Sequence, residues 1–299
     1  MSSSAPVLGH KNIEDFVFVL LFILYTLCRQ HNQKAMKLTT PLAAGLVMAN
    51  TIASSPAVKR NNELLLSQKS PSNATVGQQG SHEWSQNWAG AVLGGSDFQT
   101  VAGTFVVPEL VLPAGARPER YYAASAWVGI DGWRGECKGV LMQTGLIFWI
   151  QDNKYDSRAW YQWYPNKNVQ IYHMEFSPGD SVTLTLTASS ETGGIAIIDN
   201  NTKGTSVNHT FVNVSPRLCR TTAEWIFEDF RDPQGQVPFA NFGNVTFTNA
   251  FAVNSNGTRF GPADANLLDM IDQSGSDWSV LTDVAVDDSS VSVVYEKRP

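Results

Sequence analysis

Three carboxylic acids, Glu224, Glu228 and Asp229, lie within six residues of one another in the segment 221–230 (TTAEWIFEDF). The rest of this segment has the apolar and aromatic composition of a buried strand. A buried ionised carboxylate is costly unless it is paired, hydrogen-bonded or kept protonated. Taken alone, the segment is also consistent with an edge strand whose acids face water, because charged side chains are mostly exposed.

A pair of acids on one strand is a feature of many β-sandwich glycosidases, so this chemistry is the first to test. In a regular strand Glu224 and Glu228 share a face but lie roughly 13 Å apart, at ~3.3 Å per residue. Retaining glycosidases need ~5–5.5 Å between their carboxyl groups and inverting ones ~6.5–9.5 Å. The spacing therefore counts against a glycosidase unless a bulge brings the two acids together.

Other common catalytic machineries are missing from the sequence. The three histidines after residue 80 form neither His-x-His nor His-Glu-x-x-His, so we expect no metal site and no cofactor. No Gly-x-Ser-x-Gly elbow and no phosphate-binding loop occurs. The Asp-Thr/Ser-Gly motif of paired-aspartate peptidases is also absent, and the nearest match, Gln143-Thr144-Gly145, has an amide in place of the carboxylate.

Aromatic side chains accompany these acids and amides. Most tryptophans pack in cores, and we expect this for more than half of them here. The remainder could line a groove that binds sugar rings or an extended peptide. The tryptophans in question are Trp84, Trp88, Trp127, Trp133, Trp149, Trp160, Trp163 and Trp225.

The elements that must position these residues are strands. From residue 88 onward, about a dozen runs of β-branched and aromatic residues follow one another, separated by turn signals. Residues 181–187 and 290–296 alternate as strands with one wet face do. Only residues 264–272 suggest a helical turn. This pattern predicts an all-β fold, an antiparallel β-sandwich of two curved sheets of the concanavalin or jelly-roll kind.

The charge of the chain is unevenly distributed. Residues 1–80 carry seven Lys/Arg and three Asp/Glu, whereas residues 81–299 carry fourteen and twenty-four, a balance of −10. So acidic a body is a poor match for nucleic acid or an anionic membrane surface, and we expect neither as a partner. An acidic medium would neutralise many of these carboxylates and relieve their repulsion.

The first eighty residues have the features of processing signals. Residues 16–28 form an apolar run too short to span a bilayer, although a signal anchor there is an alternative. A basic start, an apolar middle and small residues around Ala53 predict a signal peptide at 36–54. We therefore interpret residues 1–35 as an upstream extension, 55–80 as a propeptide with a dibasic pair at Lys59-Arg60, and 81–299 as the functional domain.

Export to the extracellular space predicts two further features. Of three cysteines, Cys28 lies in the segment that is removed, so the pair Cys137 and Cys219 is expected to form one disulfide. Asn-x-Ser/Thr sequons are dense and predict a glycoprotein. Besides Asn73 they lie at Asn200, Asn208, Asn213, Asn244 and Asn256.

Several separated motifs resemble one known family. They are NWAG (87–90), VAGTFVVP (101–108), AWVGIDG (126–132), LMQTG (141–145), WYQWYP (160–165), AEWIFEDF (223–230) and VPFA (237–240). Their order and spacing resemble the fungal glutamic peptidases, the eqolisins (scytalidoglutamic and aspergilloglutamic peptidase-like), over nearly all of residues 84–296. The steps from Cys137 to Gln143 and from Cys219 to Glu228 look like the family's disulfide beside its two catalytic residues.

The resemblance implies a function and the residues that perform it. It implies a secreted acid endopeptidase, made as a proenzyme, that binds protein or peptide substrates in a concave groove as a monomer. Gln143 and Glu228 match the catalytic dyad, and Trp88, Trp127 and Asp131 match positions near the substrate. There are two departures at substrate-binding positions, because Ile147 and Gln162 stand where some members carry acids that touch substrate.

The residues themselves are suited to this chemistry. Glu228 can act as general base to a water and then as general acid to the leaving amine, while the Gln143 amide donates to the developing oxyanion. Two alternatives stay open: a secreted carbohydrate-active enzyme or lectin that uses the tryptophan groove, and an inactive binding relative, against which the intact Gln143 and Glu228 argue.

Overall fold

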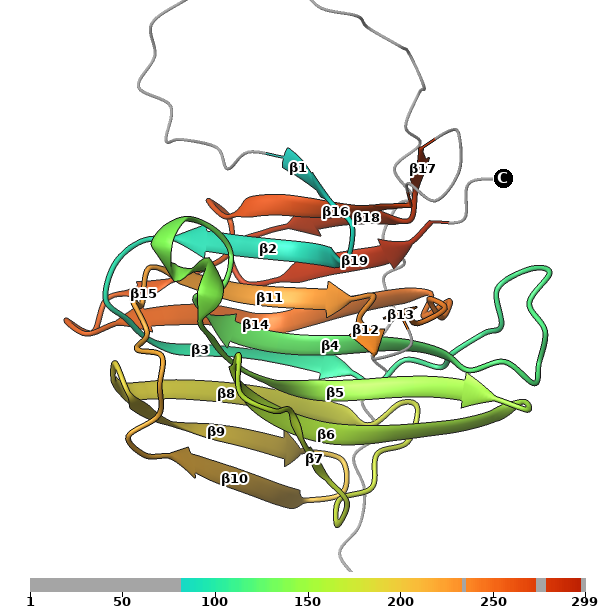
Figure 1. Ribbon diagram of the computed structural model, residues 1–299, viewed down its shortest axis with the longest axis horizontal. Helices are drawn as coiled ribbons and strands as arrows, with labels where there is room; N and C mark the ends of the chain where they lie inside the picture. The colour runs from blue at the N-terminus through green and yellow to red at the C-terminus, as the bar shows by residue number, and fades with distance from the viewer. Residues whose placement is uncertain (1–81, 233–234, 273–277, 297–299) are drawn as a thin grey trace, which may run out of the picture. The chain divides into compact units, whose positions relative to one another are not determined.

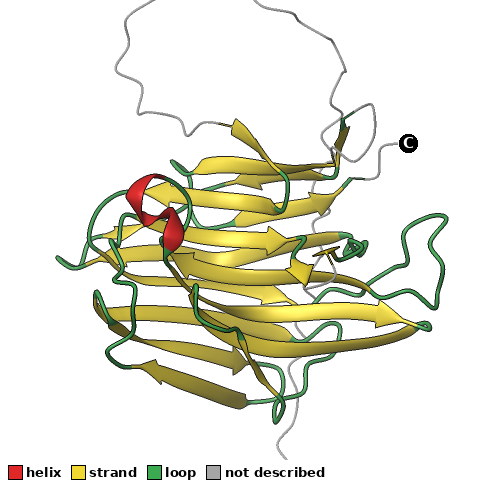
Figure 2. Ribbon diagram, in the orientation of Figure 1, coloured by secondary structure: helices red, strands yellow, loops and turns green. Residues whose placement is uncertain are grey.

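The computed structural model describes residues 82–232, 235–272 and 278–296. The expected extension, signal peptide and propeptide lie outside the described residues. Nearly all regular structure in the described part is β-strand, arranged as two large sheets and a small two-stranded one (Figures 1 and 2). One short 3-10 helix, η1 (Gly135–Gly139), precedes β5. No helix of the described residues is long and apolar enough to cross a membrane.

The first sheet contains the strands that carry the candidate site residues. Its order is β1 (His82–Ser85), β16 (Asn266–Asp272), β2 (Trp88–Gly94), β11 (Thr222–Glu228), β4 (Tyr122–Ile130), β5 (Leu141–Gln151), β6 (Lys154–Tyr164) and β7 (Val169–Ile171), with β17 (Ser279–Val280) paired to β16. Neighbouring strands are antiparallel except β1 and β16.

The second sheet packs against the first. Its order is β10 (Thr205–Phe211), β9 (Gly193–Asn200), β8 (Ser181–Ser190), β3 (Phe98–Val106), β14 (Asn244–Asn254), β19 (Val291–Tyr295) and β18 (Thr282–Val286), with β15 (Arg259–Phe260) paired to β14. The small sheet is β12 (Arg231–Asp232) with β13 (Gly235–Gln236). The predicted antiparallel β-sandwich is confirmed.

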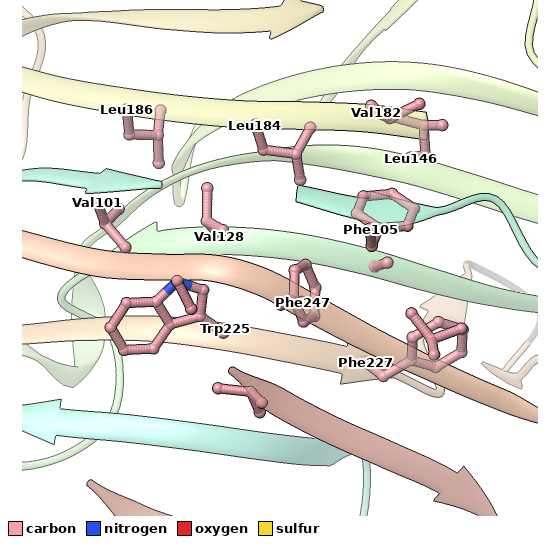
Figure 3. Packing of buried hydrophobic residues seen from close by; sticks show 14 of the residues in the cluster. Val101, Phe105, Val128, Leu146, Val182, Leu184, Leu186, Trp225, Phe227 and Phe247 are labelled. Atoms are coloured by element: carbon pink, nitrogen blue, oxygen red, sulfur yellow. The ribbon is translucent and has the colours of Figure 1, made fainter. Parts of the chain in front are cut away.

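Strand β11 is an interior strand, paired to β2 on one side and to β4 on the other. The reading of residues 221–230 as an edge strand with acids facing water is therefore wrong. Alternation sends Trp225 and Phe227 into the core between the sheets (Figure 3), while Glu224 and Glu228 point to the opposite face. The Trp225 indole N–H donates to the Ala102 carbonyl of β3 at 2.8 Å, which links the two layers.

The hairpin β5–β6 has a local cause in the sequence. Asp152 and Asn153 both adopt positive φ, 52° and 57°, the backbone of a two-residue turn that such residues favour. This turn pairs Gln151 with Lys154 and fixes the register, so that Gln143 lies opposite Gln162. The turn therefore decides which side chain becomes the neighbour of Gln143.

The helical turn predicted at residues 264–272 is wrong, because residues 266–272 form β16. Leu268 and Met270 are both fully buried, and the strand is paired to β1 on one side and β2 on the other. Helix propensity is a weak preference of a few tenths of a kcal/mol per residue, and the hydrogen bonds and burial of an interior strand outweigh it.

Candidate active site

A cleft of about 1150 Å³ lies over the face of the first sheet that is turned away from the core. Gln143 from β5 and Glu228 from β11 both line it, although β4 runs between their strands. Asn87, Trp88, Ile147 and Gln162 line the same cleft. The two residues proposed to act together thus face one space, from positions 85 residues apart in the sequence.

Glu228 is surrounded by N–H donors. The Trp127 indole donates to Oε2 at 2.8 Å, and the Trp88 indole and the Asn87 amide each donate to Oε1 at 3.3 Å. Burial raises the pKa of Glu228 above its ordinary value, while these three hydrogen bonds act to lower it. The carboxyl group is therefore held in a fixed orientation, and burial, the larger of the two effects, leaves its pKa raised.

Gln143 is only 7% exposed and its amide is held by a second amide. Gln143 Nε2 donates to Gln162 Oε1 at 2.8 Å, and Gln162 Nε2 donates to the Asn166 carbonyl oxygen at 2.7 Å. Gln143 Oε1 has no hydrogen-bond partner among the described residues. The amide is therefore fixed through one N–H of its NH2 group, and the second N–H of that group can donate to a polar group that enters the cleft.

Four positions on four strands form one row across the cleft face: Glu224, Gly129, Gln143 and Gln162 are successive partners in the sheet. Glu224 is fully buried, and this burial raises its pKa well above the ordinary value. Its carboxyl lies over Gly129, where an added Cβ would come within 3.0 Å of Glu224 Oε2 and 2.8 Å of Leu141 Cδ1. Glycine at 129 thus makes room for the Glu224 side chain, which does not line the cleft.

Two predicted substrate-binding residues are found elsewhere. Asp131 is fully buried and absent from the cleft lining; its carboxylate accepts the backbone N–H groups of Cys219, Arg220 and Thr221, each at 2.8 Å. It fixes the backbone just before β11, so its predicted contact with substrate does not fit its position. Trp127 is also fully buried, and its indole N–H donates to Glu228 and not to a group in the cleft.

The remaining predicted substrate residues do line the cleft. Trp88 is half-buried and donates to Glu228, while Gln162 contacts both the cleft and Gln143. Asn87 was missed by the sequence reasoning, although it stands first in the NWAG motif and could have been found there. Asn166 was also missed, since a backbone carbonyl carries no sequence signal.

Cys137 and Cys219 form the predicted disulfide, which joins η1 to the segment before β11 with 6.0 Å between the Cα atoms.

Of the predicted glycosylation sites, Asn208, Asn213, Asn244 and Asn256 are exposed. Asn200 is not: it is 1% exposed and its Nδ2 donates to Asp180 Oδ2 at 2.8 Å. The folded protein leaves no room for a glycan on that amide, so we do not expect Asn200 to be glycosylated.

The described residues hold no group of three or more His, Cys, Asp or Glu side chains arranged to bind a metal ion. The polar groups at the cleft are instead carboxyl, amide and indole groups.

Comparison with known proteins identifies the family. The model of the Peptidase A4 family matches residues 86–295. The chain belongs to this family. It is a glutamic-type endopeptidase. It is 43% identical over 228 residues to aspergillopepsin-2 of Aspergillus niger, covering 71% of this chain and 78% of that protein. It is 39% identical over 217 residues to scytalidopepsin B of Scytalidium lignicola, covering 70% and 77%.

Solved structures agree with this assignment. Scytalido-glutamic peptidase in complex with a transition state analog inhibitor matches with a TM-score of 0.61 and 37% identity, covering 71% of this chain and 98% of that one. Aspergilloglutamic peptidase from Aspergillus niger matches with a TM-score of 0.54 and 45% identity, covering 58% and 99%. The glutamic peptidase resemblance is confirmed, and the body has the fold of its relatives.

Proposed function

We propose that this protein is a secreted endopeptidase that hydrolyses peptide bonds in acid, with Gln143 and Glu228 as its catalytic dyad. The observation that carries the proposal is the pairing in one cleft of a carboxyl group held by three N–H donors with an amide that can donate a hydrogen bond. Family membership supports peptide substrates.

The chemistry begins with a water molecule between the two side chains. Ionised Glu228 accepts a proton from this water as its oxygen bonds to the carbonyl carbon of the scissile peptide. The carbonyl oxygen becomes an oxyanion, and the N–H of Gln143 that is not bonded to Gln162 donates to it. Glu228 then gives its proton to the leaving nitrogen, the C–N bond breaks, and the carboxylate is regenerated.

The proposed acid optimum follows from two opposing requirements. Glu228 must be ionised to accept a proton from water, so activity falls as pH drops through its pKa, which burial raises and the three donors hold back. As pH rises, protonation of the leaving nitrogen becomes harder and the buried acids Glu224 and Asp229, whose pKa values are raised by burial, begin to ionise and destabilise the fold. The loss of activity at low pH and the loss at high pH are thus both expected to depend on the protonation of carboxyl groups.

Digestion of acid-denatured casein by the secreted protein, measured from pH 2 to 7 with and without pepstatin, tests this function. We expect cleavage at low pH that pepstatin does not inhibit, since the sequence lacks the Asp-Thr/Ser-Gly motif. Absence of proteolysis together with binding on a glycan array or digestion of a polysaccharide would favour the carbohydrate alternative instead. N-terminal sequencing of the secreted protein checks the proposed signal peptide and propeptide.

A further inference from the structure

The side chain of Gln162 determines which way the Gln143 amide faces. A carbonyl oxygen can only accept hydrogen bonds, so the Gln162 group that faces the Asn166 carbonyl at 2.7 Å must be its NH2. Gln162 Oε1 then faces Gln143, at 2.8 Å, and can be satisfied only by the NH2 of Gln143. The direction of both amides is therefore set by one backbone carbonyl.

The Asn166 carbonyl is itself held in place. The Asn166 backbone N–H donates to the Trp163 carbonyl at 2.8 Å, and its side-chain Nδ2 donates to the Ser215 carbonyl at 3.1 Å. The Trp163 indole, which is 2% exposed, donates to the Pro216 carbonyl at 2.8 Å. Two chain segments about fifty residues apart thus hold the end of the amide chain.

We propose that Gln162 is a positioning residue that keeps Gln143 with its NH2 group on the Gln162 side and its Oε1 on the other. This rests on the proposed role of Gln143. A free glutamine amide can rotate by half a turn, which would present oxygen, not N–H, to a developing oxyanion. The amide of Gln162 can donate to the Asn166 carbonyl at every pH, whereas a carboxyl group in its place could do so only when protonated.

Two substitutions separate this role from a merely structural one. Gln162→Leu removes both hydrogen bonds and should lower kcat about tenfold or more, a part of the ~10²–10³-fold cost of losing an oxyanion donor, with KM changing less than about threefold. In Gln162→Glu the protonated carboxyl group can donate to the Asn166 carbonyl and accept from Gln143, so it should retain near wild-type kcat at about pH 3.

Ionisation of the new carboxyl group in Gln162→Glu should remove this rescue. A carboxylate cannot donate to Asn166, and its second oxygen would face the carbonyl oxygen there. The charged groups that line the cleft are Lys138 of η1, Lys167 of the loop after β6, Glu228 of β11, and Arg231 and Asp232 of β12. With three cations and two acids along the cleft, we expect the ratio of variant to wild-type kcat to fall about tenfold between pH 4 and 6, around the ordinary range of a glutamate.

Gln151 supplies the matched control. It is the last residue of β5, is exposed, lies outside the cleft lining, and its Nε2 donates to the Glu119 backbone carbonyl at 3.1 Å, as that of Gln162 does to Asn166. Gln151→Leu and Gln151→Glu should leave kcat and its pH profile within about twofold of wild type. Thermal unfolding of all four variants reports whether the fold is intact.

The outcomes distinguish this inference from the proposed function. A pH-dependent ratio for Gln162→Glu with a uniform loss for Gln162→Leu supports the positioning role. Wild-type kcat in Gln162→Leu, or a flat ratio for Gln162→Glu, overturns it while leaving the dyad standing. Full activity of Gln143→Ala would instead remove the proposed function and the basis of the inference together.

Discussion

Trp127 Nε1 donates to Glu228 Oε2 at 2.8 Å, across the β4–β11 pair, from an indole that is fully buried. The other two contacts of Glu228, from Trp88 and Asn87, are longer at 3.3 Å. All three partners are donors, and such partners favour the ionised form of a carboxyl group. Trp127 therefore opposes the rise in the Glu228 pKa that burial causes.

Trp127→Phe should move the acid limb of the kcat/KM profile to higher pH. Loss of the indole N–H removes the shortest hydrogen bond to the carboxylate, so the Glu228 pKa rises further. At a given low pH, Glu228 is then protonated in a larger fraction of the enzyme molecules, and these molecules lack the general base. We expect a shift of about one unit, since a charged hydrogen bond is worth ~1.5–3 kcal/mol. Trp160→Phe is the control, because its indole lines the same cleft but donates to Ser125. An unmoved acid limb in Trp127→Phe would contradict this account.

The fold should lose stability between about pH 4 and 7, in part through Asp229. Burial raises the pKa of Asp229 from 3.8 to about 7, with the charges of Glu228 and Asp272 adding to the effect. A carboxyl whose folded-state pKa is raised binds more protons folded than unfolded, so its stabilisation is complete below pH 3.8 and decreases as pH rises toward 7. The contribution of Asp229 to the free energy of unfolding should therefore fall by roughly 4 kcal/mol across this pH range.

Asp229→Asn should flatten this pH dependence, as measured by urea unfolding at pH 3.5, 5 and 7. A residual slope should remain because the pKa of Glu224 is raised in the same direction. Asp264→Asn, at an exposed position, is the control and should leave the slope unchanged. Equal slopes for Asp229→Asn and wild type would refute the assignment.

Asp131→Ala should destabilise the protein without weakening substrate binding directly. The variant leaves three backbone N–H groups before β11 without their carboxylate, at an expected cost of about 3 kcal/mol or more. Asp97→Ala removes only an exposed partner of Arg220 and should cost less than ~1 kcal/mol. If Asp131→Ala raised KM strongly at unchanged stability, Asp131 would be a substrate ligand after all.

The cleft should favour peptides with acidic side chains near the scissile bond. Three exposed cations, Lys138, Lys167 and Arg231, line it, and none of them has an ion pair among the described residues. They outnumber the two acids of the lining, Glu228 and Asp232. Ile147 adds no charge. We expect kcat/KM for a peptide with Glu to exceed that of the matching Lys peptide several-fold at pH 5 and low salt, and the preference to shrink in salt and below pH 4.

Lys138→Glu, Lys167→Glu and Arg231→Glu should each reduce that preference, and Lys154→Glu, on the β5–β6 turn outside the cleft lining, should not. A preference for Lys over Glu in the wild-type protein would be the opposite of this prediction.

Much of this architecture can be predicted from local sequence. Alternation at residues 181–187 and 290–296 indicates the strands β8 and β19, because this signal acts within a few residues. Residues 264–272 suggest a helical turn and not the strand β16, because the position of β16 between β1 and β2 depends on partners elsewhere in the chain. The interior position of β11 likewise depends on β2 and β4.

The site divides in the same way. Gln143 and Glu228 could be named through motifs, whereas the burial of Asp131 and Asn200 could not, because nothing in their own segments indicates how the folded chain encloses them. The contact between Gln143 and Gln162 required the register of β5 against β6, and the contact from Gln162 to Asn166 required a backbone position. A single sequence does not specify which residues of two paired strands lie opposite each other, and these contacts depend on that register.

The most direct test of the central claim is kcat/KM for one peptide substrate with Gln143→Ala, Glu228→Gln and the double variant at the wild-type pH optimum. We predict a loss of about 10²–10³-fold for Gln143→Ala and about 10²–10⁴-fold or more for Glu228→Gln. The double variant should lose much less than the product, because the two groups act on one water and one carbonyl. Wild-type activity in either single variant would contradict the account.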